Sequence, residues 1–229
     1  MSIASQVEII KSRIAGAARE AGRNPEDITL IGVTKTVSAD RAREVMAAGV
    51  MDLGENRVQA FLDKYETLGN APRWHLIGHL QTNKVKYIVG KVALIHSVDT
   101  LHVAEEISKK AVAEGITQQI LMQFNISGEV SKSGATADEA KHLLESVSAL
   151  HGLSVQGLMT MAPLGATETE TRRLFADLRT LAESIDNEGF PNVSMTQLSM
   201  GMSGDFESAI REGATLVRIG SALFSHLES

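Results

Sequence analysis

One lysine and two loops rich in glycine and serine carry the residue types that could do chemistry in this sequence. Lys35 follows an apolar run within "ITLIGVTKT" (28–36), at the point where the run should give way to solvent. The segments "SMGMSGD" (199–205) and "RIGS" (218–221) contain small residues, which let backbone N–H groups approach phosphate oxygens. A desolvated lysine near other cations can lose its proton and form a Schiff base. Together these features predict a site for a phosphate-bearing aldehyde.

Each of these features also has an ordinary structural interpretation. Lys35 could extend its charged end into water, and the alternation of the run does not fix its direction because both faces are apolar. The two loops could be turns with no ligand. Arg218, which interrupts the apolar segment "LVRIG" (216–220), could face a ligand or pair on the outside with a helix carboxylate. The residues alone leave these alternatives open.

The rest of the chain supplies the elements that must position these residues. Short apolar runs alternate with amphipathic segments, which argues for an α/β fold of parallel strands joined by right-handed crossovers. Eight such units in about 200 residues predict a closed (β/α)8 barrel of the TIM type, with an open doubly wound sheet as the alternative. An amphipathic helix over 3–22 precedes them, and we expect residues 1–229 to form a single domain. The expected strands are 28–35, 51–56, 73–79, 92–99, 118–125, 153–160, 193–200 and 215–221, and the expected helices include 40–48, 56–68, 100–114, 137–150 and 167–187.

The strand count gives the two loops a meaning. Barrels of this type carry their active sites at the carboxyl ends of the strands, and many bind phosphate at the loops after strands seven and eight. Residues 199–205 and 218–221 fall in those two loops, and Lys35 falls at the end of strand one. A phosphate site across the barrel mouth favours the interpretation of Lys35 as a reactive amine.

The composition excludes several other classes of protein. A net charge of −6 over 229 residues argues against a general nucleic-acid-binding surface, and the lack of cysteine excludes disulfides and thiol nucleophiles. No apolar stretch approaches the ~20 residues that span a bilayer. Charged residues throughout the first helix argue against a signal peptide, so we expect a cytoplasmic protein. His75 and His79 lie on a strand that runs into Gly78 and would not share a face, so we expect no metal site.

Six segments together resemble a known family over nearly the whole chain. The segments are "VTKT" (33–36), "GENRVQ" (54–59), "WHLIGHLQTNK" (74–84), "SGEVSKSG" (127–134), "GLMTMAP" (157–163) and "LSMGMSGDFESAIREGATLVRIGSALF" (198–224). With these segments the sequence resembles the pyridoxal-phosphate homeostasis proteins, the YggS/PROSC group. Ser225 is a small departure, since many relatives have glycine there, and it lies past the segments that matter.

The resemblance implies a fold, a cofactor and a set of residues. It implies a barrel like the N-terminal domain of alanine racemase, with pyridoxal 5′-phosphate (PLP) bound as a Schiff base to Lys35. Ser199 and backbone amides near Gly220 and Ser221 would capture the phosphate, and Arg218 would face the pyridine nitrogen. Asn56 and His79 belong to the family's loops around the cofactor. The implied cofactor-binding residues are thus Lys35, Asn56, His79, Ser199, Met200, Arg218, Gly220 and Ser221.

The same residues bear on whether the protein is an enzyme. PLP is a strong electron sink when its ring nitrogen is protonated, and an arginine beside that nitrogen opposes protonation. A two-base racemase also needs a second base, which alanine racemase takes from a tyrosine in a separate C-terminal domain that we do not expect here. Tyr65 and Tyr87 fall in predicted crossover helices instead. We therefore expect a monomeric, non-enzymatic protein that holds PLP and could pass it to PLP-dependent apo-enzymes. A racemase-like enzyme and a Schiff-base aldolase acting on a sugar phosphate are the alternatives.

Overall fold

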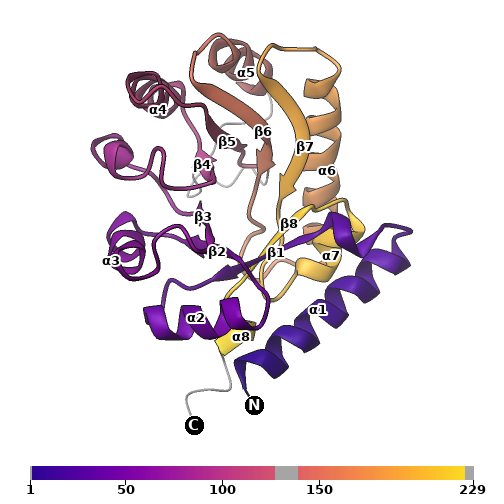
Figure 1. The fold of residues 1–229 in the computed structure, drawn as a ribbon. Coiled ribbons are helices and arrows are strands. Elements are labelled where there is room, and N and C mark those ends of the chain that lie inside the picture. The colour runs from indigo at the N-terminus through magenta and orange to yellow at the C-terminus, as the bar shows by residue number, and fades with distance from the viewer. Residues whose placement is uncertain (1, 127–138, 225–229) are drawn as a thin grey trace.

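Eight parallel strands close into a barrel in the computed structural model, which describes residues 2–126 and 139–224 (Figure 1). Each strand pairs with its sequence neighbour, and β1 pairs with β8 to complete the ring. The predicted closed barrel is confirmed, and the open doubly wound sheet is wrong. The strands are β1 (Thr29–Val33), β2 (Asp52–Glu55), β3 (Arg73–Leu76), β4 (Leu94–Val98), β5 (Gln118–Gln123), β6 (Leu153–Met159), β7 (Val193–Ser199) and β8 (Leu216–Ile219).

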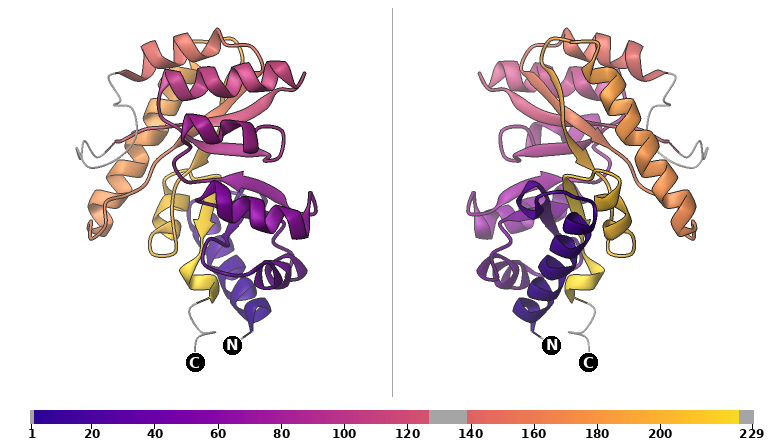
Figure 2. Two further views of the ribbon diagram at one scale, coloured as in Figure 1. Left: turned by 90° about the vertical axis from the view of Figure 1, so that its left-hand side faces the viewer. Right: turned by 90° about the vertical axis from the view of Figure 1, so that its right-hand side faces the viewer.

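Helices surround the barrel and connect its strands (Figure 2). The third crossover is a short 3-10 helix, η2 (Thr82–Tyr87), rather than an α-helix. A second 3-10 turn, η1 (Pro25–Asp27), leads into the first strand. The predicted motif over 127–134 lies outside the described residues. The α-helices are α1 (Ile3–Glu20), α2 (Ala39–Ala47), α3 (Val58–Leu68), α4 (Leu101–Ala113), α5 (Ala140–Ser148), α6 (Glu168–Asp186), α7 (Phe206–Arg211) and α8 (Ser221–Phe224). Of the described helices, none is long and apolar enough to cross a membrane.

The first helix docks beside the last two. Ser2 caps α1 by accepting a hydrogen bond from the Ser5 amide at 3.2 Å, which satisfies one of the free N–H groups at the helix start. One face of α1 is buried, including Val7, Ile10 and Ile14, and the helix contacts α7 and α8 (Figure 1). The helix predicted over 3–22 is therefore present, and it ties the start of the chain to the end of the barrel.

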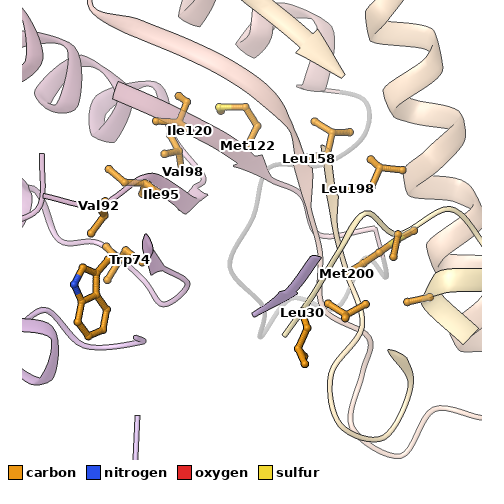
Figure 3. Close-up of a cluster of buried hydrophobic side chains, with 14 of the residues drawn as sticks. Leu30, Trp74, Val92, Ile95, Val98, Ile120, Met122, Leu158, Leu198 and Met200 are labelled. Carbon is orange, nitrogen blue, oxygen red and sulfur yellow. The ribbon is translucent and has the colours of Figure 1, made fainter. Parts of the chain in front are cut away.

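Alternation along each strand separates two layers of side chains. Outward residues such as Leu30, Ile95 and Leu158 belong to a large apolar core between the strands and the helices, part of which Figure 3 shows. Inward residues form a small apolar cluster of Ile31, Leu94, Leu121, Met159 and Leu216. Other inward positions are polar, so the inside of the barrel is only partly filled by hydrocarbon. This polar part of the interior leads to the candidate site.

Candidate ligand site at the barrel mouth

Closure of the barrel brings together segments that are far apart in the sequence. β1 pairs with β8, with Gly32 opposite Ile219, and β8 pairs with β7. Lys35 lies two residues past the end of β1, so it sits at the same end of the barrel as the loops 199–205 and 218–221. The structure therefore gathers the three segments that the sequence singled out.

A buried ion pair fixes the backbone just before Lys35. The Thr34 hydroxyl donates to Glu55 Oε1 at 2.5 Å, and Lys64 Nζ donates both to the Thr34 carbonyl at 2.9 Å and to Glu55 Oε1 at 2.8 Å. All three side chains are buried, whereas Lys35 is exposed. These hydrogen bonds offset part of the cost of burying the two charges and hold the Thr34 carbonyl in place, while Glu55 Oε2 is buried without a partner among the described residues. Lys35 thus projects from a fixed anchor toward solvent at the mouth.

Backbone amides converge at one serine beside the end of β1, because the loop after β8 neighbours that strand. Ser203 Oγ accepts hydrogen bonds from the Gly220 and Ala222 amides, each at 3.3 Å. The turn that carries Ser203 needs Gly201, because its φ of 90° is left-handed and an added Cβ would lie 2.6 Å from Ala209 Cβ. Two N–H groups and a hydroxyl that face each other make a suitable cradle for an oxyanion. Sequence analysis missed Ser203, and its signal was its place as the second serine of "SMGMSGD".

Arg218 points into the barrel. Its guanidinium donates to Ser199 Oγ at 2.5 Å and to the Thr160 carbonyl at 2.9 Å, and the residue is only 4% exposed. Burial lowers the pKa of Arg218 to about 10, partly offset by Asp205, so the group remains a cation at neutral pH. The alternative of an outward pair with a helix carboxylate is wrong. A buried guanidinium near the strand ends can bind only an acceptor.

Ser199 and Met200 lie deeper than the other expected residues. Both are fully buried. The Ser199 hydroxyl is engaged by Arg218 and by His96 Nδ1 at 2.8 Å. The Met200 side chain belongs to the outer apolar core (Figure 3), and its amide donates to the Leu216 carbonyl at 3.2 Å. Their side chains therefore support the mouth from below, and Ser203 is the serine that lies among the loop amides.

Asn56 and His79 occupy neighbouring loops after β2 and β3. A Cβ at Gly78 would lie 2.2 Å from the Asn56 carbonyl oxygen, so only glycine permits this approach of the two backbones. Asn56 is partly buried. The His79 side chain is 59% exposed, with Nδ1 3.6 Å from Asp99 Oδ2. Both residues therefore lie in the loops at the carboxyl ends of the strands, on the same side of the barrel as Lys35.

A line of buried polar residues continues below Arg218 and was missed by sequence analysis. His96 Nε2 lies 2.9 Å from His75 Nδ1, and His75 Nε2 lies 2.9 Å from Asp52 Oδ1. Burial is the main cause that lowers the pKa of His96 well below the usual value, and the neighbouring His75 and then Arg218 add to it. The available signal was a histidine at an inward strand position in "RWHLIGH" and in "VALIHSVD".

Comparison with known proteins places the chain in a family. Residues 10–228 match the family described as "Alanine racemase, N-terminal domain". A pyridoxal phosphate homeostasis protein of Aquifex aeolicus is 44% identical over 98% of each chain, and the one from Pseudomonas aeruginosa is 40% identical over 97% of this chain and 95% of the relative.

Solved structures agree with that placement. The structure of PipY from Synechococcus elongatus PCC7942, with PLP bound, superposes with a TM-score of 0.86 at 36% identity and covers 97% of this chain and 99% of PipY. Alanine racemase from Clostridium difficile 630 has a TM-score of 0.76 at 16% identity, over 98% of this chain and 58% of the racemase, which shows the shared fold. The chain belongs to the pyridoxal phosphate homeostasis protein family, whose barrel is that of the N-terminal domain of alanine racemase.

Proposed function

We propose that this protein binds PLP at the barrel mouth, as a Schiff base on Lys35, and serves in PLP homeostasis inside the cell. The observation that carries the proposal is the convergence of the Gly220 and Ala222 amides on Ser203, at the same mouth as an exposed lysine. An aldehyde and a phosphate are the two groups of PLP that such a pair of features would hold. Relatives named pyridoxal phosphate homeostasis protein and the PLP-bound PipY structure support the same ligand.

The residues present fit the phosphate of this cofactor. The Gly220 and Ala222 amides reach Ser203 Oγ at 3.3 Å, which is longer than the usual N–H···O distance of about 2.9 Å. A phosphate oxygen could therefore replace Ser203 Oγ as the acceptor and form shorter hydrogen bonds with these amides. We assign the phosphate to Ser203 and to the backbone amides of the segment 220–222, which holds Gly220, Ser221 and Ala222. Ser199, whose hydroxyl is already engaged inside the barrel, takes the part of a residue that positions Arg218.

Arg218 supports the view that the protein stores PLP and does not use it for catalysis. When bound, the cofactor supplies an aldehyde and a ring that withdraws electrons most strongly when its nitrogen is protonated. A buried guanidinium that faces the nitrogen would keep it unprotonated, because two adjacent positive charges repel. Tyr65 lies in α3, where its hydroxyl donates to Asn70 at 2.7 Å, and Tyr87 ends η2, so both tyrosines come from crossover helices. On this account the protein limits free PLP and could deliver it to apo-enzymes.

A racemase-like enzyme that uses Lys35 as one base is the alternative function, and a sugar-phosphate aldolase is the third. The test is reconstitution of purified apo-protein with PLP, followed by visible absorbance and by turnover assays with small amino acids. We expect one equivalent of PLP, a visible Schiff-base band and no turnover. Robust racemisation would show that the protein is a racemase-like enzyme and not a PLP carrier. A protein that lacks the band, and that a sugar phosphate and borohydride trap covalently, would be an aldolase.

Two serine variants test the assignment of the phosphate. Ser203→Ala should weaken PLP binding because it removes a hydroxyl from the cradle, and the effect should be smaller for pyridoxal, which has no phosphate. Ser199→Ala is the matched variant, and it should weaken the binding of PLP and of pyridoxal to a similar degree. Equal effects of Ser203→Ala on PLP and pyridoxal would assign the phosphate elsewhere.

A further inference from the structure

The buried polar line through the barrel has a hydrogen-bond donor at one end and an acceptor at the other. It runs from Arg218 through Ser199, His96 and His75 to Asp52, which are inward side chains of five different strands. Arg218 can only donate hydrogen bonds. Burial raises the pKa of Asp52, but hydrogen bonds from His75 and Arg73 outweigh it and leave that pKa below its usual value, so the carboxylate can only accept. The two ends therefore impose a direction on the groups between them.

Only one direction gives every internal group a partner. Ser199 accepts from Arg218 and donates its own proton to His96 Nδ1. His96 must then carry its proton on Nε2 and donate it to His75 Nδ1, which leaves His75 to donate from Nε2 to Asp52. Each ring has one N–H and one acceptor nitrogen, so both histidines are neutral.

The opposite direction leaves a buried group unsatisfied. If a proton were added at His75, each ring would donate toward the mouth and Ser199 would accept from both His96 and Arg218. The Ser199 proton would then need another acceptor, and none is found for it among the described residues, 2–126 and 139–224. Ser199 is fully buried, and an unpaired buried donor is costly. The neutral, one-way arrangement is therefore favoured.

We infer that His75 and His96 are positioning residues, which hold Ser199 and Arg218 in place from the far end of the barrel. The line gives the buried guanidinium a distant counter-ion in Asp52, whose other oxygen is paired with Arg73 at 2.7 Å. This hydrogen-bonded line from Arg218 to Asp52, which we call the relay, is a property of the protein without ligand. Its consequence rests on the proposed function: it would hold Arg218 where it could face the ring nitrogen of bound PLP. Asp205, in the loop after β7, is a further charged group that acts on Arg218.

Nitrogen-15 NMR of the apo-protein tests the relay without any cofactor. Near neutral pH both rings should show a protonated Nε2 and an unprotonated Nδ1. His96 should keep this form over about pH 6 to 8, the range in which an ordinary histidine changes charge. A proton on Nδ1 of either ring would overturn the inference, because it would reverse the direction of the line.

Variants of one strand test the consequence for the cofactor. His96→Leu should speed PLP release by about tenfold, the effect expected when a buried polar group loses its partner, and should change the pH profile of the bound-cofactor absorbance. His96→Asn keeps an acceptor for Ser199 and should recover most of both properties. Leu94→Ala is the matched control on β4, since it removes an inward apolar side chain next to the relay and should lower stability without moving the absorbance profile.

The outcomes separate the two ideas. If His96→Leu and Leu94→Ala release PLP alike with unchanged absorbance profiles, the relay does not position Arg218 toward the cofactor. If the wild-type protein binds no PLP at all, the proposed function fails, and the tautomers in the apo-protein still decide the relay.

Discussion

Mild acid should destabilise this protein through His96. The folded protein holds His96 fully buried with a pKa well below its usual value, chiefly because burial disfavours the charged ring. An unfolded chain exposes the same ring, which titrates at about 6.5. Below that pH, unfolding takes up a proton that the folded state does not bind. The free energy of unfolding should therefore fall as the pH drops below about 6.5, and be unaffected by this group above it.

The size of the effect follows from the linkage between protons and stability. One proton taken up on unfolding corresponds to about 1.4 kcal/mol per pH unit. Because the unfolded histidine is only partly protonated near its pKa, the loss between about pH 7.5 and about pH 5.5 is roughly 1 kcal/mol for one residue. For a chain of this size such a loss lowers the melting temperature by about 2–4 °C.

The assay is urea unfolding of the apo-protein at a series of pH values, with two variants. His96→Asn has no group that titrates there and should lose this part of the pH dependence. His102→Asn replaces an exposed histidine of α4 and should keep the wild-type slope. If His96→Asn and the wild-type protein lose stability in parallel as the pH falls, the fold does not hold His96 neutral and His96 is not the source of the acid sensitivity.

Two further changes test the anchors of the mouth. Lys64→Met should cost about 3 kcal/mol in urea unfolding because it strands the buried carboxylate of Glu55, and adding Glu55→Gln should restore part of that loss; equal stability of the single and double variants would contradict this. Gly78→Ala should cost about 1–3 kcal/mol and weaken PLP binding, since its Cβ would displace the Asn56 backbone, whereas Gly204→Ala, with open space around it, should be mild. A Gly78→Ala protein as stable as the Gly204→Ala protein would show that the loops move freely.

The fold could be predicted because the amino-acid composition of the strands identifies them as buried on both faces. A run such as "LIGV" (30–33) is apolar on both faces since one face meets the barrel interior and the other meets helices, and eight such runs at regular spacing leave few topologies. The third crossover was the least predictable element, because a segment of six residues can form a 3-10 helix without the periodicity of an α-helix.

The position of the candidate site at one end of the barrel could be predicted from the sequence, but the arrangement of its side chains could be predicted only in part. Lys35 and the two loops were found because barrel topology fixes which strand ends are neighbours. The resemblance gave the phosphate to Ser199 and not to Ser203, because the sequence does not show where β7 ends and where the turn at Gly201 begins. His75 and His96 lie in apolar strands from different parts of the chain, and only the folded barrel brings His75 Nδ1 within 2.9 Å of His96 Nε2.

The most direct test of the proposed function is to locate the covalent link. PLP-loaded protein is reduced with borohydride, digested and mapped by mass spectrometry, beside Lys35→Ala and Lys109→Ala, the latter replacing an exposed lysine of α4. We predict that the reduced adduct lies on Lys35, that Lys35→Ala loses it together with the visible band, and that Lys109→Ala keeps both. An adduct on another lysine in the wild-type protein, or one retained by Lys35→Ala, would contradict the assignment of Lys35 as the anchor of the cofactor.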